Sequence, residues 1–517
     1  MQRRDFFKLG GLLGLQGLRP LTSWAQASGA PLLKVGYAER DISPEIGMEQ
    51  PGGYGKSFHR TFHDPCKARA VVFDDGAKRV ALVGLDALLV LREDVLAARQ
   101  EIQRRCGIAP DSVMIGASHS HSSGPVGMIR PGDFDHASAF VKELAYEKSS
   151  NADLKYLDMM RRQIVDAVCD ADQKRKELAC GIGSGREDRA GFNRRFRMKN
   201  GQSWTHPGKG NPDIIGPAGP IDPEVGVIGT FDPDGNLVGC VVNYACHATT
   251  SPGGISANWV YDLERTIRGQ FGSHVVVVFV QGASGDITQV DNLDPHVNPS
   301  GKKWSQIVGG RVGAESIKVL LSMHAGSLAP VAAAQTVMQI PRRRPSPERL
   351  KRSLELVKKD IKEVGATDWI FAKEIVLLDA ILQKAPSAEV EVQAIQVGPA
   401  VFVSNPAEYF CDFGLDIKRR SPFPFTYPVE LANGCVGYVP TAEALSPTGG
   451  GYETRLTAYS NLEPAAGQKM ADAGVQLASR LTPGPVPRPE LAPPFQPAGA
   501  GIGPSPWTYG NVPPEVR

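Results

Sequence analysis

The stretch SVMIGASHSHSSGP, residues 112–125, runs from a short apolar segment directly into two histidines that stand one residue apart. Side chains two residues apart in a strand share a side, so we expect His119 and His121 to project together where this strand ends. Neutral imidazole is a common zinc ligand, and the pair is therefore half of a candidate metal site. The residues alone leave a second interpretation open, in which the neighbouring serine hydroxyls satisfy both rings.

The segments on either side predict an α/β protein. Residues 68–86 (ARAVVFDDGAKRVALVGLD) and 224–247 (EVGVIGTFDPDGNLVGCVVNYACH) have the pattern of β-hairpins that turn at Asp-Asp-Gly and Pro-Asp-Gly. The β-branched run HVVVVFV at 274–280 is typical of a strand buried on both faces. Helical patterns occupy residues 92–107, 302–324 and 346–384. We therefore expect mixed β-sheets surrounded by helices in a single large domain.

A third histidine occupies a position like that of the pair. His247 closes the apolar segment GCVVNYACH, whereas most of the other histidines lie in polar loops or helices. Catalytic zinc sites need at least three protein ligands, so His247 is the favoured third one. An ordinary histidine at a strand end remains the alternative interpretation.

Several motifs resemble, in family order, those of the neutral/alkaline non-lysosomal ceramidase family. The resembling segments are ASHSHSSGP (117–125), NYACHATT (243–250), VQGASGDIT (280–288), SNPAEYF (404–410) and NGCVGYVPT (433–441). The resemblance implies one zinc ion per chain, held by His119, His121, His247, Glu408 and Tyr438. Glu408 follows Asn405-Pro406, which predicts a helix start where the helix dipole favours an ionised carboxylate. A helix-stabilising glutamate and a tyrosine that merely packs its ring are the alternatives for Glu408 and Tyr438.

The resemblance places Thr288 where the family has a serine with a direct role in amide cleavage, and the chemistry of the reaction suggests roles for the neighbouring groups. Tyr438 would steady an oxyanion, and Asp286 or Thr288, acting through water, would protonate the leaving amine. The chain departs from the family here, because Thr288 stands where the family has a serine and Gln289-Val290 replaces a Pro-Asn pair. We expect Asp86 to accept the second N–H of a ligating imidazole. The segment GFNRR, residues 191–195, resembles one near the family's pocket, and a solvated basic turn is the alternative.

These features predict a zinc-dependent amidohydrolase that uses a zinc-activated water, and the resemblance implies N-acylsphingosine or a related lipid amide as its substrate. Three alternatives remain open. The first is a zinc hydrolase of the same fold that acts on a different amide or an ester. The second is a TIM-barrel amidohydrolase, which also uses His-x-His at a strand end. The third is a non-catalytic exported binding protein.

The ends of the chain differ in composition from the middle. Residues 1–27 combine Arg3-Arg4 with a modest apolar run and a closing Ala-Gln-Ala, which predicts a twin-arginine signal and a periplasmic or extracellular protein. Residues 28–482 are the expected catalytic domain. We expect residues 483–517 to be a Pro- and Gly-rich tail, without the family's C-terminal β-sandwich domain.

The charge balance argues against one class of partner. The chain has 517 residues with 57 basic and 55 acidic side chains, and no basic block stands out. Nucleic acid is therefore not an expected partner, whereas peripheral contact with membrane lipid stays possible. The eight cysteines contain no Cys-x-x-Cys pair and exclude a zinc ribbon.

Overall fold

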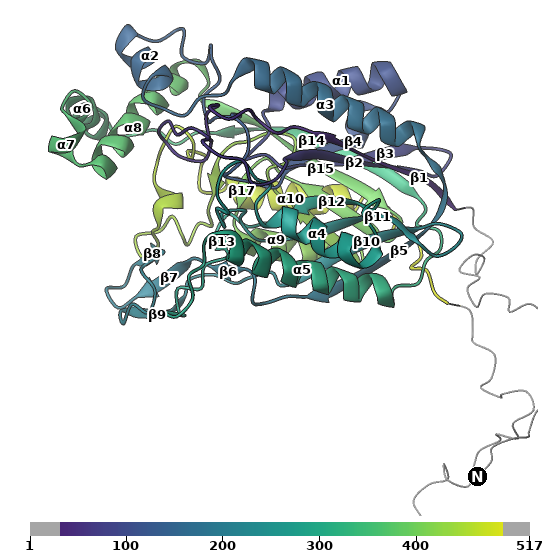
Figure 1. Ribbon diagram of the computed structural model, residues 1–517. Coiled ribbons are helices and arrows are strands. Elements are labelled where there is room, and N and C mark those ends of the chain that lie inside the picture. The colour runs from purple at the N-terminus through teal and green to yellow at the C-terminus, as the bar shows by residue number, and fades with distance from the viewer. Residues whose placement is uncertain (1–31, 490–517) are drawn as a thin grey trace, which may run out of the picture.

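A computed structural model describes residues 32–489 of the chain (Figure 1). The predicted signal at 1–27 lies outside the described residues, as does the part of the predicted tail from residue 490 onward. Within the described range, none of the helices is long and apolar enough to cross a bilayer.

The larger of two main sheets has eight strands in the order β12-β11-β10-β5-β1-β2-β3-β4. Their bounds are β1 Leu33–Asp41, β2 Lys67–Asp74, β3 Arg79–Leu85, β4 Val113–Ala117, β5 Lys176–Arg186, β10 Glu224–Phe231, β11 Leu237–Tyr244 and β12 Val276–Gln281. The two outer pairs, β3/β4 and β11/β12, are parallel, and the inner pairs are antiparallel. Both predicted hairpins are present as β2–β3 and β10–β11, with Gly76 and Gly235 at positive φ in their turns. The sheet is mixed, as expected.

A second sheet lies face to face against the first. Its strands are β14 Val331–Pro341, β15 Ser387–Val397, β16 Ala400–Ser404 and β18 Phe425–Val429, in that order. One apolar core joins the two sheets, with Phe73 and Leu82 from the larger sheet among Ile395 and Phe402 from the smaller. Each such fully buried side chain contributes about 1.5–3 kcal/mol of transfer free energy, so this layer holds the two sheets together.

Helices cover the two outer faces. α1 (Arg92–Cys106) and α3 (Leu154–Gln173) pack on one part of the larger sheet, and α4 (Trp259–Phe271) and α5 (Lys302–Ser322) pack on the other part. α9 (Cys411–Arg420) and α10 (Ala466–Ala478) cover the smaller sheet. The order of layers is helix, sheet, sheet, helix. The sheets are open rather than closed, so the TIM-barrel alternative is wrong.

A group of helices projects at one end of the molecule (Figure 1). It contains α2 (Ala139–Tyr146), α6 (Pro347–Leu356), α7 (Ile361–Val364) and α8 (Ala366–Lys384). The helical pattern predicted over 346–384 corresponds to three separate helices, α6, α7 and α8. Asp360 caps the start of α7 with its side chain, and Gly365 at φ +88° ends α7, so the chain changes direction twice.

Several short elements complete the fold. Two parallel residue pairs join β17 (Glu408–Tyr409) to β19 (Tyr438–Val439), and β13 (Ile287–Thr288) pairs with β6 (Phe192–Asn193). A three-stranded sheet contains β8 (Ser203–Thr205), β7 (Arg195–Met198) and β9 (Ile214–Pro217), and single 3₁₀ turns lie at Pro110–Ser112 and Tyr452–Thr454. The register of β17 on β19 places Glu408 directly opposite Tyr438.

Candidate metal centre

The two histidines of the opening stretch come together through a loop rather than along a strand. Strand β4 ends at Ala117, and His119 has φ +61°, a left-handed conformation that is uncommon outside glycine. The ring centroids of His119 and His121 are nevertheless 4.7 Å apart, and their Nε2 atoms are 3.1 Å apart. The prediction that the two histidines lie close together is confirmed. The predicted cause, their position on one side of a strand, is wrong. Backbone strain of this kind persists where surrounding contacts over-determine it, as at functional sites.

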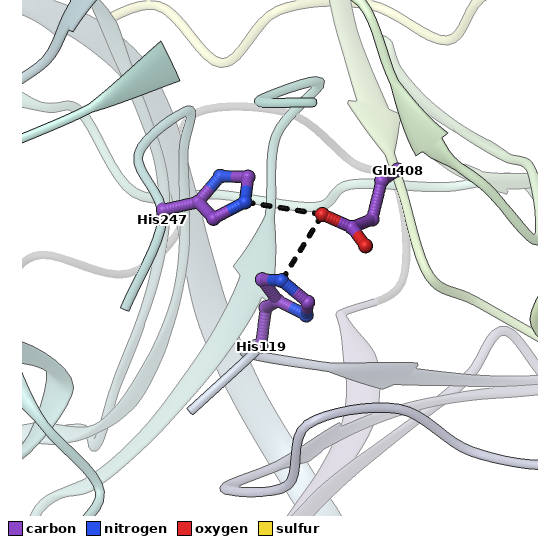
Figure 2. Close-up of side chains that lie close together, drawn as sticks. All are labelled: His119, His247 and Glu408. Atoms are coloured by element: carbon purple, nitrogen blue, oxygen red, sulfur yellow. Dashed lines mark hydrogen bonds and ion pairs between the residues drawn. The ribbon is translucent and has the colours of Figure 1, made fainter. Parts of the chain in front are cut away.

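His119, His247 and Glu408 form a buried group whose donor atoms lie within 4.8 Å of one another (Figure 2). One carboxylate oxygen of Glu408 is 3.2 Å from Nε2 of His119 and 3.1 Å from Nε2 of His247. All three side chains are almost fully inaccessible to solvent. Three segments distant in the sequence, the loops after β4 and β11 and the short strand β17, thus bring one ligand atom each to a common point.

The hydrogen bonds on the far side of each ring fix which nitrogen faces that point. Nδ1 of His119 lies 2.8 Å from the Leu88 carbonyl, and Nδ1 of His247 lies 2.8 Å from the Ser284 carbonyl. A carbonyl only accepts, so each Nδ1 carries the proton and each neutral Nε2 presents a lone pair. The Glu408 oxygen is also an acceptor. The group therefore presents converging lone pairs that only a cation can satisfy.

Protons do not satisfy all of these converging lone pairs. Burial, with the positive charge of Arg194, lowers the pKa of His247 to about 3, so its Nε2 stays unprotonated near neutral pH. Although burial opposes it, the charge of Glu408 raises the pKa of His119. Burial would raise the pKa of Glu408, but the charge of His119 and the close contacts with both imidazoles hold it well below its usual range. The contact between His247 and Glu408 is left with two acceptors and no hydrogen.

The spacing of the ligand atoms fits a tetrahedral ion. Bonds of roughly 2.0–2.1 Å to nitrogen and oxygen give a tetrahedron with edges of about 3.3 Å. The separations of 3.1 and 3.2 Å from Glu408 to the two imidazoles approach this length. The group can therefore hold a metal ion.

His121 lies at the edge of this group. Its Nε2 is 3.1 Å from that of His119, and its ring centroid is 6.3 Å from that of His247. Burial and then the charge of His119 lower its pKa well below the usual value. A side chain at Gly52 would place its Cβ 2.3 Å from Nδ1 of His121, so only glycine at that position leaves room for the ring.

Glu408 does not begin a helix, contrary to the sequence-based prediction. It lies in β17, and α9 begins three residues later at Cys411. The backbone N–H of Cys411 donates instead to Asp286, 2.8 Å away. The helix dipole that was expected to favour an ionised Glu408 thus acts on Asp286. Tyr459, which the sequence did not indicate, donates a 2.8 Å hydrogen bond to the other oxygen of Glu408.

Tyr438 reaches the same site from the opposite strand. Its hydroxyl lies 3.1 Å from Nη2 of Arg194 and 3.1 Å from the hydroxyl of Tyr452. Burial and then Glu408 raise the pKa of Tyr438, whereas the charge of Arg194 lowers it. Arg194 is itself buried, with its Nε 2.8 Å from the carboxylate of Glu453. The interpretation of GFNRR as a solvated turn is therefore wrong.

Asp286 and Thr288 are buried, but their described partners are structural. Asp286 accepts hydrogen bonds from the Cys411 amide and, at 2.8 Å, from the Asn193 side chain, and burial raises its pKa to about 6. The hydroxyl of Thr288 donates to Gln289 at 2.9 Å. Neither side chain has a described contact with the His119–His247–Glu408 group, so their catalytic assignment stays a prediction.

Asp86 does not hold a ligating histidine, and that prediction is wrong. Its carboxylate accepts from the Lys67 amide at 2.8 Å and from the Arg69 guanidinium at 2.6 Å. The carbonyls of Leu88 and Ser284 take the role that Asp86 was expected to play.

Glu430 is a further residue that the sequence did not indicate. Its carboxylate accepts from the amides of Ser284 and Tyr409, at 2.9 and 2.8 Å, and from the Ser284 hydroxyl. Burial raises its pKa to about 8. Ser284 orients His247 and Tyr409 adjoins Glu408, so Glu430 braces two ligand-bearing segments. Its place directly after the buried strand β18 resembles that of His247 after β11, a signal that could have identified it.

A cavity of about 320 Å³ lies beside the site. Tyr459 is part of its wall and, through its hydrogen bond, contacts Glu408. The wall is apolar at Leu89, Ile129 and Phe134, and it also carries charged side chains from α8 and its surroundings, namely Asp133, Glu374 and Lys384.

Comparison with known proteins agrees with this architecture. The neutral ceramidase of Pseudomonas aeruginosa is 26% identical over 307 residues, which cover 54% of this chain and only 40% of that relative. The crystal structure of the P. aeruginosa enzyme superposes with a TM-score of 0.62 at 19% identity, covering 90% of this chain and 76% of that one. A ceramidase complexed with C2 gives a TM-score of 0.61 at 18% identity, with coverages of 90% and 77%.

No protein-family model matches the chain. A sequence match over 54% of the chain and a superposition over 90% of it nevertheless both lead to a ceramidase. The resemblance noted in the motifs is thereby confirmed: the chain is similar in sequence to one neutral ceramidase and has a ceramidase-like fold.

Proposed function

We propose that this chain is a zinc-dependent hydrolase of linear amides, with N-acylsphingosine or a related lipid amide as its substrate. The observation that carries the proposal is the convergence of two imidazole lone pairs and a carboxylate within a ceramidase-like fold. His119, His247 and Glu408 would hold the ion, with His121 and Tyr438 as further ligands beside them. Nitrogen and oxygen donors in this ratio suit zinc.

The protein's own groups then have distinct roles. When bound, zinc would polarise a carbonyl and lower the pKa of a bound water to about 7. The carbonyls of Leu88 and Ser284 keep both imidazoles in the ligating tautomer. Arg194 and Tyr438 offer donors, fixed in a buried setting, to the negative charge that develops on an amide oxygen. Tyr459 links Glu408 to the cavity, where the rest of a substrate has room.

The test combines metal analysis with turnover. Purified protein is expected to contain about one metal ion per chain. It should release fatty acid from a fluorescent N-acylsphingosine and lose this activity with a chelator. If the ion binds at a free concentration near 1,000 Kd, its removal lowers the free energy of unfolding by about 4 kcal/mol. Protein without any metal would overturn the proposal, and metal without hydrolysis of any amide or ester would favour the non-catalytic binding protein.

The size of the cavity and the charges on its wall favour a substrate other than a long-chain ceramide. Its volume of about 320 Å³ lies at the lower end of the roughly 300–1,000 Å³ range of small-molecule sites, and its wall carries charged side chains. These features suit an amide or ester that is shorter or more polar than a long-chain ceramide. A substrate series that varies the acyl length at constant head group distinguishes the two, because a long-chain optimum would exclude this variation.

We also propose that the protein is exported by the twin-arginine route, on the evidence of Arg3-Arg4 and the Ala-Gln-Ala that closes residues 1–27. Replacing both arginines with lysine is expected to leave the protein in the cytoplasm. Unchanged export of the variant, measured by cell fractionation, would overturn this assignment.

A further inference from the structure

Two cysteines far apart in the sequence meet between the helices that cover the larger sheet. Cys106 is the last residue of α1, and Cys169 lies in the last turns of α3. Their sulfur atoms are 2.6 Å apart, although 63 positions separate them along the chain. Two unbonded sulfur atoms do not pack this closely, and the separation is about half an ångström longer than a disulfide bond of roughly 2.05 Å.

The contacts around the pair hold it in this arrangement. Arg105, next to Cys106, forms an ion pair of 2.7 Å with Asp166, which is one helical turn before Cys169. Arg79 donates to the Cys106 carbonyl at 2.9 Å and also pairs with Asp172, one turn after Cys169. The two helices are therefore clamped on both sides of the sulfur atoms.

We propose that Cys106 and Cys169 form a disulfide bond that links α1 to α3 in the mature protein. Each thiol gives up its hydrogen and the two sulfur atoms join. The two electrons and two protons reduce the disulfide of a thiol–disulfide oxidoreductase, or glutathione disulfide, to two thiols. Cys106 is partly exposed and is the sulfur that an oxidant reaches, whereas Cys169 is buried.

The surroundings suit a structural bond rather than a reactive thiol. Burial, together with the neighbouring Cys169, raises the pKa of Cys106. A low thiol pKa stabilises the reduced form of a cysteine pair, and Cys106 has no such stabilisation. The few thiolates present also make spontaneous exchange slow, so formation depends on the oxidant named above. The inference rests on the helix pair alone and is independent of the proposed function.

The experiment compares full-chain protein after incubation with glutathione disulfide and after reduction, with the same metal supply. Proteolytic mapping without reductant is expected to yield a peptide pair that joins residues 106 and 169, lighter by two hydrogen atoms than the separate peptides. Closing a loop of this size predicts a melting temperature about 4 °C higher for the oxidised protein.

Variants separate the bond from general effects of removing a cysteine. Cys106→Ala and Cys169→Ala should each abolish the redox-dependent difference in melting temperature. Cys240→Ala, which removes a fully buried thiol from β11, should retain that difference. Both cysteines free after oxidation, a bond to a different cysteine, or an equal redox effect in Cys106→Ala would each overturn the proposal.

Discussion

Two buried clusters of ionisable side chains use their charges in opposite ways. Beneath α4, Arg69 donates to Asp86 and Glu264, and Lys67 donates to Glu264 at 2.7 Å. In the candidate metal centre, Glu408 faces the lone pairs of His119 and His247. Every contact in the first cluster joins a donor to an acceptor, whereas the contact between His247 and Glu408 in the second cluster joins two acceptors.

This difference separates a structural ion network from a binding site. Removing a charge from water costs several kcal/mol, and a folded protein recovers that cost only through well-paired partners. The Arg69 network recovers this desolvation cost through oppositely charged partners in the chain itself. The His119–His247–Glu408 group recovers it only with an added cation, although both clusters are almost fully buried.

The largest expected effect is the loss of metal from a variant of the second cluster alone. Glu408→Gln removes the charge and the ligand oxygen shared by both imidazoles, and the protein should lose its metal. Amide hydrolysis should fall by at least roughly 10²–10³-fold, because several kcal/mol of transition-state stabilisation is lost. Elemental analysis and initial rates measure both results.

The matched control changes an equally buried glutamate in the first cluster. Glu264→Gln is expected to keep the metal and the turnover of the folded fraction, although it weakens the contact with Arg69. If Glu264→Gln and Glu408→Gln lost metal equally, the proposed contrast between the clusters would be wrong.

The second largest effect is a loss of stability, and here the variant of the Arg69 cluster should lose more than the variant of the metal centre. Arg69→Met leaves Asp86 and Glu264 buried without their shared partner and should lower the free energy of unfolding by about 3–5 kcal/mol. In metal-free protein, Glu408→Met should cost less, because it removes the contact of two acceptors between Glu408 and His247 as well as the favourable contact with His119. Denaturant titration of both variants, each compared with metal-free wild type, measures the difference, and equal losses would contradict it.

Much of the fold could be predicted because local patterns encode it. The two hairpins follow from alternating apolar residues and Asp-Gly turns, and the placement of His119, His121 and His247 follows from apolar strands that end in polar loops. The stacking of the two sheets could not be predicted, because Phe73 and Phe402 meet across more than three hundred residues. The family resemblance, rather than any local pattern, indicated Glu408.

The wrong predictions at the site also arise from tertiary contacts that local sequence patterns do not encode. Pro406 predicted a helix start, but two residues of β17 intervene, and the helix end binds Asp286 instead. Asp86 stands at a strand end near the histidine pair, and only the tertiary structure reveals that Arg69 occupies its carboxylate. Tyr459 and Glu430 act through contacts with segments distant in the sequence, which no spacing rule detects.

The smallest expected effect is a difference in pH dependence between the two clusters in metal-free protein. Burial lowers the pKa of His247 from 6.5 to about 3, so the unfolded chain binds more protons than the folded one between these values. Stability should therefore fall as the pH drops from about 6.5 toward 3. For Glu264, burial acts upward, but Arg69 and Lys67 lower the pKa from 4.5 to about 2. Its contribution should be lost at lower pH, from about 4.5 toward 2.

Unfolding free energies measured across this range separate the two windows. His247→Gln should flatten the loss between about pH 6.5 and 4.5, where the wild-type imidazole gains a proton on unfolding and Glu264 contributes little. Added zinc should steepen the same window, since protons and the ion compete for the same nitrogen lone pair. Equal profiles for the wild type and His247→Gln above pH 4.5 would mean that the converging lone pairs at His247 and Glu408 carry no cost. The proposed difference between the His119–His247–Glu408 group and the Arg69 network would then be wrong.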